Sequence, residues 1–230
     1  MTDDLVIVGA GGFGREVADV VHAVNESARN RVWNLHGIID DNPNSTNLDL
    51  LARRGLRHLG TLDTFVNQPP RPSYAIGIGN PAIRYRIATT LDAAGFTPAT
   101  LIHPDATIGS QVHIGLGSVI CAGARLTTNI TLGRHVHVNL NATIGHDTTV
   151  GDFVSINPLA SISGDCEIAR EVTLGVGSSI INGLTVGQRA VVGGGACVIR
   201  PVAPGSTVVG VPAKTRDSQA SEAPTSGENL

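Results

Sequence analysis

Aliphatic residues recur at every sixth position through the second half of the chain, without a break from residue 102 to residue 198. The positions are Ile102, Ile108, Ile114, Ile120, Leu126, Leu132, Val138, Ile144, Val150, Ile156, Ile162, Ile168, Leu174, Ile180, Val186, Val192 and Val198. Small residues stand at most positions four residues later, and glycine often follows the aliphatic residue directly. This period predicts a parallel β-helix in which each six-residue rung supplies a short strand and a corner. Three rungs close a triangular turn, and glycine is expected to tolerate the tight corner backbone.

The β-helix predicted for residues 101–200 determines which residues lie together. Equivalent residues 18 apart should stack in one column, and the 97 residues of the series make about five turns. Successive turns should lie roughly 4.8 Å apart, the spacing of paired strands. Asn139 and Asn157 share a column, which we interpret as a structural ladder, and His137 shares one with Ser155. Cys166 falls at a small inward position and is predicted to be part of the core.

The first hundred residues alternate apolar strands with helical periodicity. The expected elements are a strand over Leu5–Val8, a glycine loop over 9–14, a helix from Arg15 to about Val24, strands over Val32–Ile39 and Tyr74–Ile78, and a helix through Ile83, Ile87 and Leu91. This alternation predicts a small Rossmann-like α/β subdomain over residues 1–100. Residues 201–214 should form a loop and a strand, and the polar tail 215–230 should be disordered.

Charge and composition narrow the possible functions. The formal net charge is -3 and the basic residues are scattered, so no basic stripe indicates nucleic-acid binding. No apolar run approaches the roughly 20 residues that cross a bilayer, and the first residues lack a signal-peptide pattern. The three cysteines show no CxxC spacing, which argues against a disulfide framework or a zinc site. A reducing, cytoplasmic location is expected.

The glycine loop carries the first candidate chemistry. Gly9–Gly14 matches GxGxxG, follows a strand and opens a helix, so its amides could hold a pyrophosphate at the helix N-terminus. Asp40 and Asp41, at the end of the second strand, could take a ribose hydroxyl or a base edge. A redox enzyme would need a second substrate domain, whereas the rest of this chain is the β-helix. Nucleotide-sugar binding is therefore favoured over a dinucleotide cofactor and over a purely structural turn.

His146 carries the second candidate chemistry. It stands two residues after the core residue Ile144, so its side chain should point outward at a corner. A neutral imidazole there could accept a proton from an amine or hydroxyl as it attacks a thioester, and Asp147 could hold the other ring nitrogen. The alternative is a solvated surface histidine.

The remaining histidines and cysteines suggest no further site. His135 and His137 are also predicted to point out of the coil, which raises the possibility of a metal site. However, His113, His135, His137 and His146 differ by no multiple of 18, so no column gathers them and no metal is predicted. Cys121 and Cys197 fall near corners without a histidine in register, so thiol catalysis is not expected.

Several motifs in order resemble one known family. They are Val6–Glu16 (VIVGAGGFGRE), Ile39-Asp40-Asp41, Ile78-Gly79-Asn80 with Arg84, Leu101-Ile102-His103-Pro104, Gly145-His146-Asp147 and Gly210–Lys214 (GVPAK). Together they resemble the bacterial two-domain sugar acetyltransferases, the NeuD-type sialic acid O-acetyltransferases and the PglD-type nucleotide-amino-sugar N-acetyltransferases. The resemblance extends to residue 214 and implies that the β-helix is left-handed.

The resemblance implies a homotrimer with acetyl-CoA, a co-substrate, in the groove between neighbouring β-helices. His146 would be the general base and Asp147 its acidic partner. The nucleotide sugar would lie on Gly11, Gly12, Phe13, Asp40, Asp41 and Gly79. Acetyl-CoA would lie along Ser155, Asn157, Val176 and Gly194, although some relatives carry a second histidine where this chain has Ser155.

The implied reaction is direct acetyl transfer to the amine of a nucleotide-linked 4-amino-4,6-dideoxy sugar, without a metal. O-acetylation of a sugar of the sialic-acid type is the first alternative. The second, from another class, is an NAD-linked or nucleotide-binding protein in which the β-helix is only a trimer scaffold.

Overall fold

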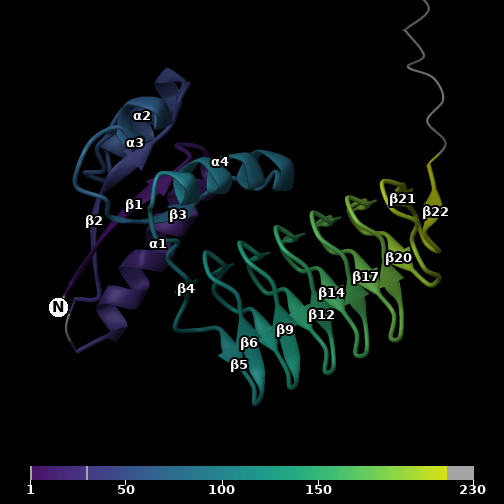
Figure 1. Ribbon diagram of the computed structural model, residues 1–230. Helices are drawn as coiled ribbons and strands as arrows, with labels where there is room; N and C mark the ends of the chain where they lie inside the picture. Colours follow the sequence, from purple (N-terminus) through teal and green to yellow (C-terminus); the bar gives the residue numbers. More distant parts are fainter. Residues whose placement is uncertain (1, 30, 217–230) are drawn as a thin grey trace, which may run out of the picture.

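The computed structural model describes residues 2–29 and 31–216, as an α/β domain followed by a parallel β-helix (Figure 1). The elements of the domain are β1 (Asp3–Val8), α1 (Gly12–Ser27), β2 (Trp33–Ile39), α2 (Ser45–Ala52), α3 (Leu62–Val66), β3 (Ser73–Ile76) and α4 (Pro81–Ala93). Its three strands are parallel in the order β2-β1-β3, so their carboxyl ends meet at one edge. The prediction omitted two short helices, α2 and α3.

Close backbone contacts fix the start of α1. An added Cβ at Gly14 would lie 1.8 Å from the carbonyl oxygen of Gly9, and one at Gly77 would lie 2.4 Å from the Cα of Gly14. Only glycine at these positions allows the helix to approach β1 and the end of β3 so closely. The helix therefore begins directly at the carboxyl edge of the sheet, where the amides of the glycine loop are gathered.

The β-helix has three faces, each a sheet. Face 1 contains β4 (Leu101–Ile102), β7 (Val119–Ile120), β10 (His137–Val138), β13 (Ser155–Ile156), β16 (Thr173–Leu174), β19 (Val191–Val192), β21 (Thr207–Val209) and the antiparallel β22 (Lys214–Thr215). Face 2 contains β5 (Thr107–Ile108), β8 (Arg125–Leu126), β11 (Thr143–Ile144), β14 (Ser161–Ile162), β17 (Ser179–Ile180) and β20 (Cys197–Val198). Face 3 contains β6 (Val112–Ile114), β9 (Ile130–Leu132), β12 (Thr149–Val150), β15 (Glu167–Ile168) and β18 (Thr185–Val186). These faces make about six turns, one more than the predicted five.

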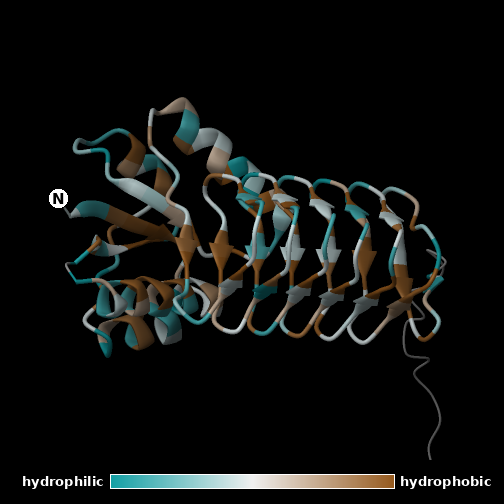
Figure 2. Cartoon of the chain, turned by 90° about the horizontal axis from the view of Figure 1, so that it is seen from below, coloured by the Kyte–Doolittle hydropathy of each residue, from teal (hydrophilic) through white to brown (hydrophobic). Residues whose placement is uncertain are grey.

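The predicted 18-residue register is confirmed. His137 pairs with Ser155 on face 1, and Thr143 pairs with Ser161 on face 2. Almost all the periodic aliphatic residues are buried, and Figure 2 shows hydrophobic residues repeating from rung to rung. Ile102 and Ile108 are each 37% exposed, because they lie in the first turn, which has no turn before it. Cys166 is buried in the same core, as predicted.

The role of the corner glycines differs from the prediction. The left-handed corner position comes three residues after the aliphatic one, and it holds Asp147 (φ 59°) and Leu159 (φ 62°) as well as glycines. The glycine directly after the aliphatic residue is needed for stacking instead. An added Cβ at Gly145 would lie 2.5 Å from the amide nitrogen of Gly164 on the next turn.

The α/β domain packs against face 1 of the coil. Phe13, at the start of α1, contacts His137 with ring centroids 4.8 Å apart, and Tyr74 of β3 stacks on His135 at 5.8 Å. Both histidines are therefore fully buried, which the sequence did not predict. They do point out of the coil, but the domain covers them.

The far end of the chain is only partly described. The tail predicted to be disordered, residues 215–230, lies outside the described residues from 217 onward, while Thr215 belongs to β22. Among residues 2–29 and 31–216, no helix has the length and apolar character to cross a membrane.

Candidate active site

His146 lies at the corner between β11 on face 2 and β12 on face 3. Its side chain is 61% exposed, and its Nδ1 lies 2.6 Å from Oδ2 of Asp147. The corner is held by the ladder, because the Asp165 amide donates to the His146 carbonyl at 2.7 Å. The imidazole is thus presented to solvent on a rigid backbone.

The protonation of this pair follows from the state of the carboxylate. Nδ2 of Asn129, one turn earlier, donates to Oδ1 of Asp147. The hydrogen bonds from Asn129 and then from His146 lower the pKa of Asp147 below its usual value, so the carboxylate is ionised and only accepts hydrogen bonds. Nδ1 of His146 must carry the proton that is donated. In the neutral ring, Nε2 is then the free basic atom.

The ring of His146 also lies against the next turn. An added Cβ at Gly164 would fall 2.5 Å from both Cε1 and Nε2 of the ring. Gly164 is 18 residues after His146, so the register could have identified it, but the sequence reasoning missed it.

The glycine loop and its acidic neighbours meet at the carboxyl edge of the sheet. Oδ2 of Asp40 accepts from the Ala10 amide at 2.7 Å, which ties the loop to the end of β2. An added Cβ at Gly11, Gly12 or Gly79 would meet nothing within 4 Å among the described residues. These three glycines therefore border open space at one edge, as a bound nucleotide requires.

Asp41 lies apart from the loop contacts. Its Oδ1 accepts from the amide of Leu62 at 2.7 Å, at the first residue of α3. The structure thus brings Asp40 directly to the loop and uses Asp41 to hold the next helix.

A buried arginine joins this edge to the coil. Arg84 of α4 is 0% exposed and donates from Nη1 to the carbonyls of Ile78 (2.8 Å) and Gly79 (3.1 Å). On the coil side its acceptors are the carbonyls of His135 (3.0 Å), Phe153 (2.7 Å) and Val154 (3.2 Å) and the hydroxyl of Ser155 (2.9 Å). Burial lowers the pKa of Arg84 to about 9, so the guanidinium is charged at neutral pH. The sequence offered no sign of this role beyond the place of Arg84 in a motif.

The residues expected on the donor side divide into two groups. Val176 and Gly194 stack one turn apart at the corner between faces 1 and 2, and Val176 is 54% exposed. Asn157 follows β13 at the start of the same corner and is half-buried. Ser155 is buried beneath the domain, where its Oγ donates to the Gly79 carbonyl at 2.7 Å.

The two halves of the candidate site lie on opposite sides of one coil. The α/β domain covers face 1, whereas His146 is at the corner between faces 2 and 3, which is the corner opposite face 1. The glycine loop therefore cannot meet His146 of its own chain across the packed core.

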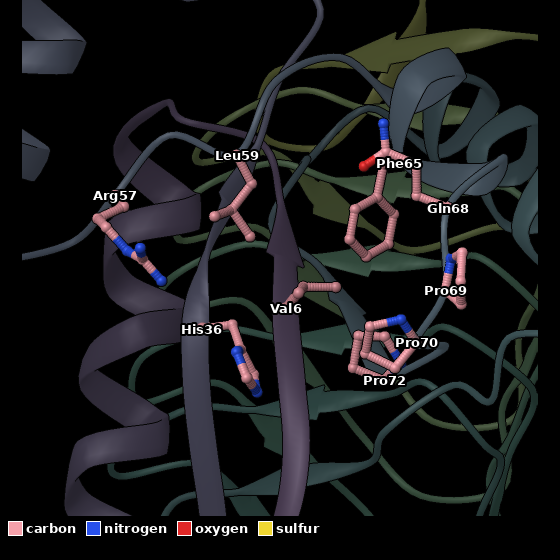
Figure 3. A pocket seen from close by; sticks show the side chains of 9 residues that line it. All are labelled: Val6, His36, Arg57, Leu59, Phe65, Gln68, Pro69, Pro70 and Pro72. Carbon is pink, nitrogen blue, oxygen red and sulfur yellow. The ribbon is translucent and has the colours of Figure 1, made fainter.

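A separate pocket of about 220 Å³ lies on the sheet face of the α/β domain. It is lined by Val6, His36, Arg57, Leu59, Phe65, Gln68, Pro69, Pro70 and Pro72, with Val6 and Phe65 directed into it (Figure 3). The pocket lies along the strands, away from the glycine loop at their carboxyl ends. Among the described residues, no group of three or more His, Cys, Asp and Glu could hold a metal ion.

Comparisons with known proteins identify the family. A family model described as the PglD N-terminal domain matches residues 4–91. The acetyltransferase domain of PglB from Neisseria gonorrhoeae has 31% identity and a TM-score of 0.81, over 94% of this chain and 100% of that one. The chain belongs to the PglD-type two-domain sugar N-acetyltransferases. The predicted family, fold class and acyltransferase class are confirmed at this level.

The names of two further relatives state what those proteins act on or bind. A histidine-to-asparagine variant of perosamine N-acetyltransferase from Caulobacter crescentus, solved with CoA and GDP-perosamine, has 26% identity and a TM-score of 0.81, over 93% of this chain and 96% of that one. GDP-perosamine N-acetyltransferase from Escherichia coli is 29% identical over 144 residues, 61% of each chain. The PglB domain has also been solved with acetyl coenzyme A. These names favour acyl transfer over the NAD-linked alternative.

Proposed function

We propose that this chain transfers an acetyl group from acetyl-CoA to the amine of a nucleotide-linked amino sugar of the 4-amino-4,6-dideoxy type. The observation that carries the proposal is the His146–Asp147 pair. An ionised carboxylate fixes the proton on Nδ1 and leaves Nε2 as a base on an exposed corner. The relatives that bind CoA and a GDP-linked amino sugar support the same reaction.

The proton would pass through His146, whose Nδ1 is already held by Asp147. The sugar nitrogen attacks the thioester carbonyl, forming the C–N bond, while Nε2 of His146 takes the amine proton. Asp147 stabilises the imidazolium that forms, because its carboxylate already accepts from Nδ1. The C–S bond then breaks, and the imidazolium proton goes to the departing CoA thiolate.

The substrates would use the two open regions of the chain. The diphosphate would lie on the amides of Gly11, Gly12 and Phe13 at the start of α1, with Asp40 and Gly79 beside it. Acetyl-CoA would run along the corner of Asn157, Val176 and Gly194.

Ser155 has a different place in this account. Its hydroxyl is engaged by Gly79 and Arg84, so it would support the nucleotide loop and not contact the thioester.

A trimer would complete the site. Because the nucleotide loop lies over face 1 and His146 lies at the opposite corner, one subunit's loop would need His146 from another subunit. The corner of Val176 and Leu159, which are 54% and 61% exposed, offers apolar surface for such a contact. Size-exclusion chromatography with light scattering should therefore give three times the monomer mass.

Replacing the base tests the reaction. His146→Ala should lower the rate of acetyl transfer about 100- to 10,000-fold if His146 is the general base. His113→Ala is the matched control, since His113 is an exposed histidine of the coil, on β6, without a carboxylate partner among the described residues. Near-normal turnover by His146→Ala would refute the assignment.

A thermal-shift panel separates the proposal from the NAD-linked alternative. Acetyl-CoA and a nucleoside diphosphate amino sugar should each raise the melting temperature of the full chain, because both would bind only the folded state. A rise with NAD alone would favour the alternative.

A further inference from the structure

The proposed general base, His146, stands beside a column of three side chains, of which the reaction scheme uses only Asp147. Asn129, Asp147 and Asp165 follow one another at intervals of 18 residues at the corner between faces 2 and 3. Asn129 and Asp147 both have left-handed backbones, with φ of 56° and 59°. The Asp147 amide donates to the Thr128 carbonyl at 3.2 Å, so the backbone sets Asn129 directly beside Asp147.

The side chains in this column form a chain of hydrogen bonds. Nδ2 of Asn129 donates to Oδ1 of Asp147, and Oδ2 of the same carboxylate lies 2.6 Å from Nδ1 of His146. The side chain of Asp147 is 50% exposed, so nothing buries the carboxylate in this rotamer. The amide of Asn129 is the contact that holds one oxygen and turns the other toward the ring.

Gly164 fixes the other side of the ring. An ideal Cβ at this position would lie 2.5 Å from Nε2, far inside van der Waals contact. Gly164 carries no strained left-handed backbone that would explain a glycine there, because its φ is not among the positive values. The imidazole of His146 occupies the space that a side chain at position 164 would fill.

We propose that Asn129 and Gly164 are positioning residues for His146: Asn129 orients Asp147 so that His146 carries its proton on Nδ1, and Gly164 seats the ring so that Nε2 faces the acceptor. The proposal rests on the proposed role of His146 as the base. Asn129 acts on His146 through Asp147, and Gly164 acts on it through direct contact with the ring. The imidazole free in water favours the opposite tautomer, with the proton on Nε2, which would leave no base at the reacting edge.

Asn129→Asp is the sharpest test, because aspartate has the same shape and tolerates the left-handed backbone but cannot donate to Asp147. We expect kcat to fall about 10- to 100-fold, since a slightly misplaced base costs this much, with KM for both substrates unchanged. Gln111→Glu is the control, one turn earlier in the same column with φ of 56°, and should keep normal kcat. Asn129→Gly is the second variant and should show the same loss without adding a charge.

Nitrogen-15 NMR of the histidine rings provides a readout that a structural role would not move. In the wild-type protein His146 should give the Nδ1–H tautomer, and in Asn129→Asp a mixture of the two tautomers. A tautomer and a kcat that are both unchanged in Asn129→Asp would overturn the role of Asn129.

Gly164→Ala should lower kcat by a similar factor, and the loss should vanish when His146 is already alanine. An equal loss with and without the His146 ring would show that Gly164 acts on the coil and not on the base.

Failure of this inference can be told from failure of the proposed function. If His146→Ala keeps normal turnover, the function is wrong whatever the variants of Asn129 do. If His146→Ala is inactive while Asn129→Asp behaves as the wild type, only the positioning role is wrong.

Discussion

Two neutral histidines are sealed between the α/β domain and face 1, and acidification should destabilise the protein through them. His135 and His137 are fully buried, and neither nitrogen of His137 nor Nδ1 of His135 has a hydrogen-bond partner among the described residues. Burial, followed by the positive charge of Arg134, lowers the pKa of His135 to about 4. Burial and Arg84 lower the pKa of His137 well below the usual value of 6.5.

The sign and the pH window follow from linkage. Both histidines bind protons near pH 6.5 when the chain is unfolded but not when it is folded, so the unfolded state gains as the pH falls. The free energy of unfolding is therefore highest above pH 6.5 and falls as the pH drops from 6.5 to about 4. Each histidine contributes about 1.4 kcal/mol per pH unit in this window, so the pair should cost about 3 kcal/mol between pH 7.5 and 5.5. Carboxyl groups with lowered pKa values, such as Asp92, titrate below this window.

Urea unfolding at one protein concentration, at pH 7.5 and 5.5, would measure this loss. Fluorescence of Trp33, the single tryptophan, reports on the α/β domain. His137→Leu should remove about half of the pH dependence, because an apolar side chain there has nothing to protonate. His113→Gln, at an exposed histidine, should leave it unchanged. Equal stability at the two pH values, or an unaltered slope in His137→Leu, would refute the reasoning.

Three further predictions concern other contacts. Arg84→Met should lower the free energy of unfolding by about 3 kcal/mol or more, because the buried carbonyls lose their hydrogen-bond donor. Arg86→Met, on the exposed face of α4, is the control and should change the free energy of unfolding by no more than about 0.5 kcal/mol, as measured by urea titration. Burial raises the pKa of the Cys121 thiol to about 12, so mass spectrometry after iodoacetamide treatment should find the half-buried Cys197 modified well before it; equal labelling would contradict this. Asp40→Ala removes the acceptor of the Ala10 amide, so the KM for the nucleotide sugar should rise about 10-fold or more while the KM for acetyl-CoA stays unchanged. An increase in both KM values would indicate a general defect.

The repeat predicted the coil because its register depends only on which residues point inward. The same register placed His146 outside and Cys166 inside correctly. It could not show that His135 and His137 are covered, because nothing within a rung reveals what packs on its outer face. The burial of those histidines depends on Phe13 and Tyr74, more than sixty residues earlier in the chain.

Two other misses have equally local causes. Gly145 was predicted to supply the corner conformation. It is needed instead because the backbone of the next turn lies so close that a Cβ at this position would clash with it. The helices α2 and α3 have only eight and five residues, which is too few to show a clear helical period in the sequence. Their N-caps are Asn44 and Thr61. That His146 and the glycine loop lie on opposite sides of the coil could not be predicted, because the sequence does not show which face of the coil the α/β domain covers.

Mixed trimers test the central claim, that His146 of one subunit serves a nucleotide sugar held by another. His146→Ala and Asp40→Ala would be co-expressed with different tags and purified through both. At a concentration of GDP-linked 4-amino sugar well below the KM of Asp40→Ala, each variant alone should transfer acetyl from acetyl-CoA at no more than about a tenth of the wild-type rate. The mixed trimers should recover a substantial fraction of wild-type transfer, because some sites combine the intact loop of one chain with the intact His146 of the other. Mixed trimers no more active than the separate variants would contradict the shared site.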